Sequence, residues 1–217
     1  MATAPRDRLR YSNVAIVLHW AIAALILYNL ASGLLRPLLP AGFFQFHVSA
    51  GITILLLSVV RVAWRLTHRP PPMLAMKGWE RGLAHAVHFL LYAAMLIVPF
   101  SGWALVSAKP PAGSPGAAWS AAHPPASHDP APSAKPPRPR GPTMIWAVVK
   151  LPLLAPVNTI GREAEGVPAQ RALRARIETF HMLGGWAMLA LVLLHVAGAL
   201  KHQVLDRQRE LARMGLG

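Results

Sequence analysis

The chain has 217 residues, of which 54% are hydrophobic and only 14% are charged, a composition too apolar for a soluble domain and one that indicates lipid as the solvent. Lys and Arg outnumber Asp and Glu by 22 to 8, which in a membrane protein is typical of basic cytoplasmic loops and gives no reason to expect nucleic acid as a partner. The absence of cysteine excludes disulfides, thiolate metal sites and covalent c-type heme, so a bound metal must use His, Met or oxygen ligands.

Four apolar runs are long enough to cross a bilayer, since roughly 20 helical residues span the hydrocarbon core of about 30 Å. They cover residues 14–35, 43–66, 82–108 and 179–200. The first run is longer than the 7 to 15 apolar residues of a usual signal peptide, so we expect it to be a retained helix. The predicted fold is an all-α integral membrane four-helix bundle with a long proline-rich external loop.

The basic residues predict the orientation of these spans. They gather before the first run, between the second and third, and after the fourth, whereas the turn between the first two runs contains only Arg36. Because basic loops stay in the cytoplasm, both termini and the 61–81 turn are expected on the cytoplasmic side. The basic residues on which this rests are Arg6, Arg8, Arg10, Arg61, Arg65, Arg69, Lys77, Arg81, Lys201, Arg207, Arg209 and Arg213.

The external segment separates the third span from the fourth. The expected organisation is therefore three spans in 1–108, an external loop in 109–167, and the fourth span with a cytoplasmic tail in 168–217. Residues 109–142 contain eleven of the 21 prolines, which predicts polyproline-like disorder without a core. Residues 144–157 are apolar but interrupted by prolines, so we expect them to lie on the outer membrane surface. An unbroken helix is expected from Pro168, starting outside the bilayer.

Four histidines lie inside the predicted spans, where ionisable side chains are costly. His19 and His195 fall in the cytoplasmic half, and His47 and His181 in the outer half, so they form two pairs of matched depth. On the fourth span, 14 residues separate His181 from His195, which places them within about 40° of one face and about 21 Å apart. Imidazoles from facing helices suit six-coordinate b-type hemes. The alternative for each is a histidine bonded to a neighbouring carbonyl.

Small residues stand one turn from three of these histidines: Gly51, Gly184, Gly185 and Gly198. They would let a macrocycle approach the backbone. Close packing between helices explains them as well.

Further polar residues stand at the cytoplasmic ends of the spans. His85 and His88 share a helix face beside Arg81, which suits a quinone head group or a heme propionate, although an ordinary interfacial pair is the alternative. Arg61 and Arg65 suit propionates of the inner heme, because a guanidinium matches a carboxylate. Anchoring at the cytoplasmic interface explains both arginines equally well.

Several stretches taken together resemble the bacterial diheme cytochrome b561 family, which is related in sequence to the b-type subunits of nickel-iron hydrogenases. The resemblance covers all four spans in order but not residues 109 to about 165. The matching stretches are residues 10–12, 18–20, 46–51, 83–88, 91–92, 99–103 and 194–195, with Arg61, Arg65 and His181.

This resemblance implies a four-helix protein of the bacterial inner membrane that binds two b hemes. The implied axial ligands are His19, His47, His181 and His195. Members pass single electrons between a one-electron partner and the quinone pool, and one known activity oxidises superoxide outside while reducing ubiquinone. For this chain we expect quinone near the inner heme, beside His85, His88 and Lys77, with His202 assisting its protonation.

The external donor and the class of function stay open on the sequence alone. Residues 109–178 carry nine Lys and Arg against four Asp and Glu, a net charge of +5 that would attract a small anion such as superoxide or an acidic protein. The second interpretation is an electron-carrier or membrane-anchor cytochrome b subunit of a larger dehydrogenase. A third is a heme-free transporter of metal ions or protons that uses membrane histidines.

Overall fold

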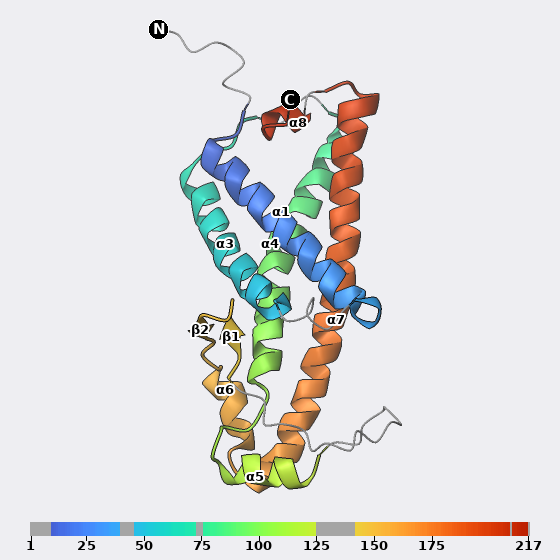
Figure 1. Ribbon diagram of the computed structural model, residues 1–217. Helices are drawn as coiled ribbons and strands as arrows, with labels where there is room; N and C mark the ends of the chain where they lie inside the picture. Colours follow the sequence, from blue (N-terminus) through green and yellow to red (C-terminus); the bar gives the residue numbers. More distant parts are fainter. Residues whose placement is uncertain (1–9, 40–45, 73–75, 125–141, 209, 217) are drawn as a thin grey trace. The chain divides into compact units, whose positions relative to one another are not determined.

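The structure, a computed structural model, describes residues 10–39, 46–72, 76–124, 142–208 and 210–216. Within these ranges four helices are long and apolar enough to cross a membrane (Figure 1), which confirms the four predicted spans and the all-α bundle. They are α1 (Asn13–Leu34), α3 (His47–Thr67), α4 (Gly78–Ser107) and α7 (Val167–Leu200). The predicted residues 43–45 of the second span, and Arg6, Arg8 and Arg209, lie outside the described residues.

Local sequence signals define the ends of these helices. The Ser12 hydroxyl caps α1 by accepting a hydrogen bond from the Ala15 N–H at 3.3 Å. After α1 the chain enters the short 3₁₀ helix η2 (Arg36–Leu38), whose proline cannot continue an α-helix. Pro99 lies inside α4 without ending it, as is common in membrane helices. Helix α7 begins one residue before Pro168, as the sequence predicts.

The chain forms two compact units. The first comprises Met1–Phe100 and Met182–Gly217, and the second comprises Ser101–His181. All four long helices contribute to the core of the first unit, which consists of Ile22, Ile26, Ile54, Met95 and Met188. Many large apolar side chains on the same helices are exposed, as expected for surfaces that face lipid.

The carboxyl end of the first unit folds back onto its amino end. Helix α7 continues into a π-helical turn, η5 (Lys201–Leu205), which is followed by the short helix α8 (Glu210–Arg213). The Tyr11 N–H donates to the Arg213 carbonyl at 3.2 Å, and the Trp20 indole donates to the Met214 carbonyl at 2.9 Å. These contacts tie the tail to α1 and to Tyr11, two residues before its start.

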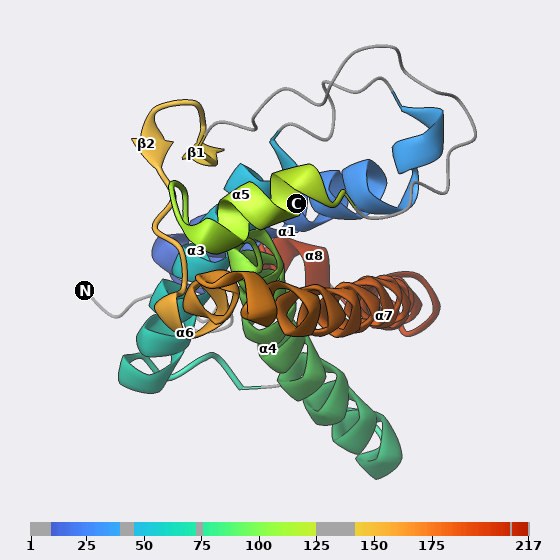
Figure 2. The same cartoon turned by 90° about the horizontal axis from the view of Figure 1, so that it is seen from below.

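The second unit contains a helix and a hairpin where the sequence predicts disorder and an irregular apolar segment. It includes α5 (Pro115–Ala122), β1 (Met144–Ile145), β2 (Val149–Lys150), α6 (Ala155–Asn158), η3 (Thr159–Gly161) and η4 (Ala164–Gly166). The strands pair antiparallel, Met144 with Lys150 and Ile145 with Val149, in the yellow hairpin of Figures 1 and 2. Trp146 and Ala147 at its turn both have positive φ, the pattern of a type I′ turn.

The prediction of disorder is wrong for residues 115–122. Ser114 caps α5 through a hydrogen bond from the Ala117 N–H, and Pro115 occupies the first turn, where its missing N–H costs nothing. Gly116 is buried and donates to the Arg162 carbonyl at 2.9 Å. A helix of eight residues thus gains its stability from backbone contact with the chain beyond the loop. Residues 125–141 lie outside the described part.

The apolar segment 144–157 is also anchored within the second unit. The Trp103 indole donates to the Pro152 carbonyl at 2.7 Å, and the Leu154 N–H donates to the Ser107 hydroxyl at 3.0 Å. Leu151 is 2% exposed. Its position on the outer membrane surface stays a prediction.

Gly116→Ala should loosen the second unit, because a β-carbon there would lie 1.9 Å from the Gly161 carbonyl oxygen. Overpacking of this kind costs about 1–3 kcal/mol. We expect faster cleavage within residues 109–166 in limited proteolysis of the purified protein. Gly82→Ala is the control, since its β-carbon would meet nothing within 4 Å. Equal cleavage rates for both variants would contradict this account of α5.

Candidate functional site

Three histidines from three helices lie together in the first unit, and we call them the histidine cluster: His19 on α1, His88 on α4 and His195 on α7. The ring centroids of His19 and His195 are 6.1 Å apart, with 66° between the ring planes. The His88 ring lies 5.1 Å from that of His195, almost perpendicular to it. The structure therefore brings His19 and His195 together, as their depth in the sequence predicts.

Arg61 supplies the contribution of α3 to this cluster. Its guanidinium donates to the Ala15 carbonyl at 3.2 Å and to the Tyr92 hydroxyl at 3.3 Å, and it lies 3.3 Å from His19 Nδ1. All four long helices thus meet at one polar site inside an apolar bundle. A fixed positive charge at this position makes the site suitable for an anionic group.

The cluster has the ligands that a heme requires. Two facing imidazoles at this distance can share one metal ion, since a metal–imidazole bond measures about 2.0–2.1 Å, and imidazole is a usual axial ligand of heme iron. Gly198 follows His195 by one turn, and a β-carbon there would meet nothing within 4 Å. This leaves open space for a macrocycle beside the ligand.

The donor set does not suit a non-heme metal site. Among the described residues, no group of three or more His, Asp or Glu side chains could hold a metal ion. A heme supplies four ligands itself and needs only two from the protein. His19 and His195 could supply these two.

Of the other site residues predicted on α3 and α4, some belong to the histidine cluster and some do not. His88 belongs to it, and its Nδ1 lies 2.6 Å from the Ala84 carbonyl. No hydrogen bond or ring contact within the described ranges joins His85 to the cluster, and its side chain is exposed. Arg65 is exposed in the last turn of α3, one turn beyond Arg61. The sequence did not anticipate that His88 contacts His195, because that contact depends on how the helices are rotated.

The other two predicted ligands are each bonded to a buried serine. His47 is the first residue of α3, and its Nδ1 lies 2.9 Å from the Ser32 hydroxyl on α1. In the second unit, His181 Nδ1 lies 3.0 Å from the Ser101 hydroxyl on α4. The sequence analysis missed both serines. The signal that could have found them is the Ser–Gly dipeptide that occurs in the first and the third apolar run.

The glycines near the histidines have different surroundings. A β-carbon at Gly184 would lie 2.8 Å from the Val98 side chain, so close helix packing explains this glycine. A β-carbon at Gly51 would lie 3.4 Å from the Asn29 side chain, whereas at Gly185 it would meet nothing within 4 Å. Gly185 and Gly198 are therefore the two of the four whose surroundings leave space beside a histidine.

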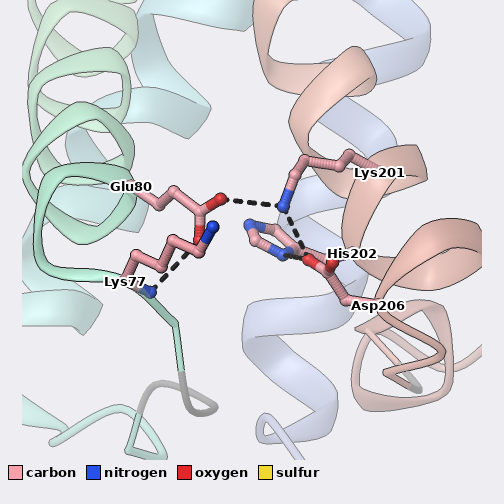
Figure 3. Close-up of polar contacts among 5 residues, drawn as sticks. All are labelled: Lys77, Glu80, Lys201, His202 and Asp206. Atoms are coloured by element: carbon pink, nitrogen blue, oxygen red, sulfur yellow. Dashed lines mark hydrogen bonds and ion pairs between the residues drawn. The ribbon is translucent and has the colours of Figure 1, made fainter.

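A charged network joins the start of α4 to the end of α7 (Figure 3). Lys201 contacts Glu80 and Asp206, each at 2.8 Å, and His202 Nδ1 lies 2.6 Å from the same Asp206 carboxylate. Lys77 contributes its backbone N–H, which donates to Glu80 at 3.1 Å. Of these residues, His202 and Lys77 are predicted from the sequence as site residues. Their partners Asp206 and Glu80 are not.

The electrostatics of this network keep Asp206 ionised. The Lys201 ammonium, followed by the His202 imidazole, holds the pKa of the Asp206 carboxyl below its ordinary value. An ionised carboxylate only accepts hydrogen bonds, so the shared proton of the His202–Asp206 contact resides on His202 Nδ1. The side chains of His202 and Asp206 are 13% and 33% exposed, which gives water access to the pair.

Comparison with known proteins identifies the family. A family described as "Prokaryotic cytochrome b561" matches residues 10–217. The chain belongs to this family. It is therefore a multi-pass membrane protein of the cytochrome b type.

Three related proteins each match part of the chain. The chain is 29% identical over 102 residues to "Probable superoxide oxidase CybB" of Yersinia pestis, 34% over 104 residues to "Cytochrome b562" of Cereibacter sphaeroides, and 31% over 107 residues to "Cytochrome b561 homolog 2" of Escherichia coli. These matches cover 45%, 42% and 46% of the chain. The chain spans 58%, 63% and 56% of the length of these relatives.

Replacing either ligand in the cluster should remove the same heme. His19→Ala and His195→Ala are each expected to lower the heme content of the purified protein by one heme per chain, measured as the pyridine hemochrome. His68→Ala is the control, because this exposed histidine stacks on Trp64 outside the cluster. Full heme content in both ligand variants would exclude this pair.

Proposed function

We propose that the protein is a diheme b-type cytochrome of the bacterial inner membrane that passes single electrons from an external donor to the quinone pool. The supporting observation is the histidine cluster, where the ring centroids of His19 and His195 lie 6.1 Å apart beside Arg61. The proposed donor is superoxide, in keeping with the name of the Yersinia pestis relative. The proposed acceptor is ubiquinone.

The proposed axial ligands are those of the two sequence pairs. His19 and His195 hold the inner heme, and His47 and His181 remain the predicted ligands of the outer one. Fourteen residues of continuous helix separate His181 from His195, which corresponds to about 21 Å along α7. When bound, the hemes supply one-electron chemistry across the membrane.

Arg61 has a second role in this proposal. A guanidinium has only donors, so in its contact with Arg61 the His19 Nδ1 must accept, which places the ring hydrogen on Nε2. For His19 to bind a metal through Nε2, that hydrogen must move to Nδ1 and Arg61 must give up this contact. The released guanidinium is then available to pair with a heme propionate. Arg65, exposed one turn away, is the second candidate for a propionate.

On the external side, positive charge is proposed to attract the electron donor. The external residues 109–178 have the net charge of +5 described above, which favours the approach of an anion. Two superoxide anions each lose one electron and leave as O₂. One ubiquinone gains these two electrons together with two protons and leaves as ubiquinol. No other co-reactant is needed.

The acceptor end of the reaction is proposed at the cytoplasmic side. His88 contacts His195, and because its Nδ1 donates to the Ala84 carbonyl, its Nε2 can accept a hydrogen bond from a hydroxyl of the reduced quinone. His202, bonded to Asp206 and partly exposed, is placed to pass protons from water. His85 and Lys77 remain candidates to bind the head group. Basic residues here stabilise the reduced, anionic quinone before it is protonated.

Stopped-flow spectroscopy of the purified protein tests this direction of electron flow. Superoxide generated enzymatically should reduce the hemes at a rate that falls as ionic strength rises, because salt screens the external charge. Added ubiquinone should then reoxidise them. His88→Ala should slow this second phase and leave the first unchanged, with His68→Ala as the control.

Two results would contradict the proposal. Hemes that superoxide does not reduce would favour a subunit that receives electrons from a protein partner. A His88→Ala variant that is slowed only in the superoxide phase would place quinone at the other end.

Asp206→Asn should slow the quinone phase while preserving heme content. The substitution keeps the size of the side chain but removes the charge that faces Lys201 and His202. Because general acid catalysis contributes about 10²–10⁴-fold and His202 itself remains, the loss should be smaller than that. An unchanged rate of reoxidation would exclude this pair from proton delivery.

A further inference from the structure

The same local arrangement occurs at two predicted heme ligands. Each histidine has a serine hydroxyl at Nδ1, from Ser32 for His47 at 2.9 Å and from Ser101 for His181 at 3.0 Å. Both serines belong to a neighbouring helix, and they are only 1% and 7% exposed. A hydroxyl buried in an apolar helix is costly unless it is bonded. These two are bonded to imidazoles.

The direction of the bond at His47 follows from a second contact. The Ser32 hydroxyl donates its hydrogen to the Asn29 carbonyl at 3.3 Å. Because a hydroxyl has one hydrogen, the same oxygen must accept from His47, and Nδ1 of that ring must carry the hydrogen. The lone pair of the neutral ring is then on Nε2. Metal-binding histidines are held in this way, with the second nitrogen donating to an acceptor.

The residue after each serine is a glycine in close contact with the same imidazole. A β-carbon at Gly33 would lie 3.2 Å from His47 Cε1, and one at Gly102 would lie 3.0 Å from His181 Cε1. Both distances are tighter than ordinary van der Waals contact, so a side chain here would push the ring. The dipeptide thus supplies a hydrogen-bond acceptor and the space in which the ring lies.

We propose that the dipeptides Ser32–Gly33 and Ser101–Gly102 are positioning elements that hold His47 and His181 in the tautomer whose Nε2 binds iron. The inference rests on the proposed function in that it takes both histidines as axial ligands. The serines raise the basicity of the ligands toward iron and fix the orientation of the rings. The glycines keep the rings from being displaced.

Titration of hemin into the apoprotein of Ser32→Ala and Ser101→Ala tests this proposal. The dissociation constant of the affected heme should rise by about 10- to 100-fold, the usual cost of losing such a partner. Its midpoint potential should also rise, because a less basic imidazole stabilises ferric iron less. Ser32→Thr and Ser101→Thr keep a hydroxyl and should restore both values toward those of the wild type.

The controls separate positioning from packing. Ser58 is fully buried on α3, and its hydroxyl has no hydrogen-bond partner in the structure, so Ser58→Ala removes a buried hydroxyl without touching a ligand. It should leave affinity and potential unchanged. Gly102→Ala should weaken heme binding, whereas Gly82→Ala, on the same helix and with a β-carbon that meets nothing within 4 Å, should not.

Two outcomes would overturn the inference in distinguishable ways. If His47→Ala loses a heme but Ser32→Ala matches Ser58→Ala in affinity and potential, the positioning role is wrong and the ligand set stands. If His47→Ala and His181→Ala both retain two hemes, the proposed ligands are wrong and the inference fails with them.

Discussion

An imidazole inside an apolar helix has two polar nitrogens that lipid cannot satisfy, and the structure is arranged around this constraint. His19 meets Arg61, His88 meets the Ala84 carbonyl, and His47 and His181 each meet a serine hydroxyl. The contacts of His19, His47 and His181 join two helices and so limit how each is rotated about its axis, whereas the His88 contact lies within α4. The histidines, which are costly to place inside apolar helices, therefore also restrict how those helices are arranged.

The two kinds of histidine partner have different chemical consequences. A serine that already donates elsewhere accepts the hydrogen of Nδ1 and leaves Nε2 ready for a metal, as at His47. A guanidinium can only donate, so Arg61 holds His19 in the opposite tautomer and must move when His19 binds iron. Under the proposed ligand set, heme binding at the cluster would therefore need a rearrangement that His47 would not.

The end of α7 adds charge where the apolar bundle meets water. The π-helical turn η5 contains Lys201 and His202, and π-helical turns occur frequently at functional sites. The acids Glu80 and Asp206 compensate the positive charge there and connect α4 with α7. Exposed ion pairs contribute little free energy, so this network does more to orient its side chains than to stabilise the fold.

Hydropathy and spacing were sufficient to predict the four spans, the long fourth helix and the proximity of His19 to His195. These features depend on one-dimensional patterns: the length of apolar runs, the distance to flanking basic residues and the helical period. The contacts of His88 and of the two serines depend on helix rotation, which no pattern within a single span reports.

The same limit explains the error over α5. Proline content predicts disorder when no partner is known, but Gly116 forms a close backbone contact with residues 161 and 162, some 45 positions along the chain. Composition cannot reveal such a contact. The local signal for this helix is the Ser–Pro–Gly sequence at the start of α5.

The central claim is that histidine pairs of this bundle bind two b hemes. The most direct test is the ratio of heme to protein in the purified wild-type chain, from the pyridine hemochrome and quantitative amino-acid analysis. The account predicts about two hemes per chain, each bound without a covalent link and giving the spectrum of low-spin, six-coordinate heme b. A ratio near one, or a high-spin spectrum showing an open axial position, would contradict it.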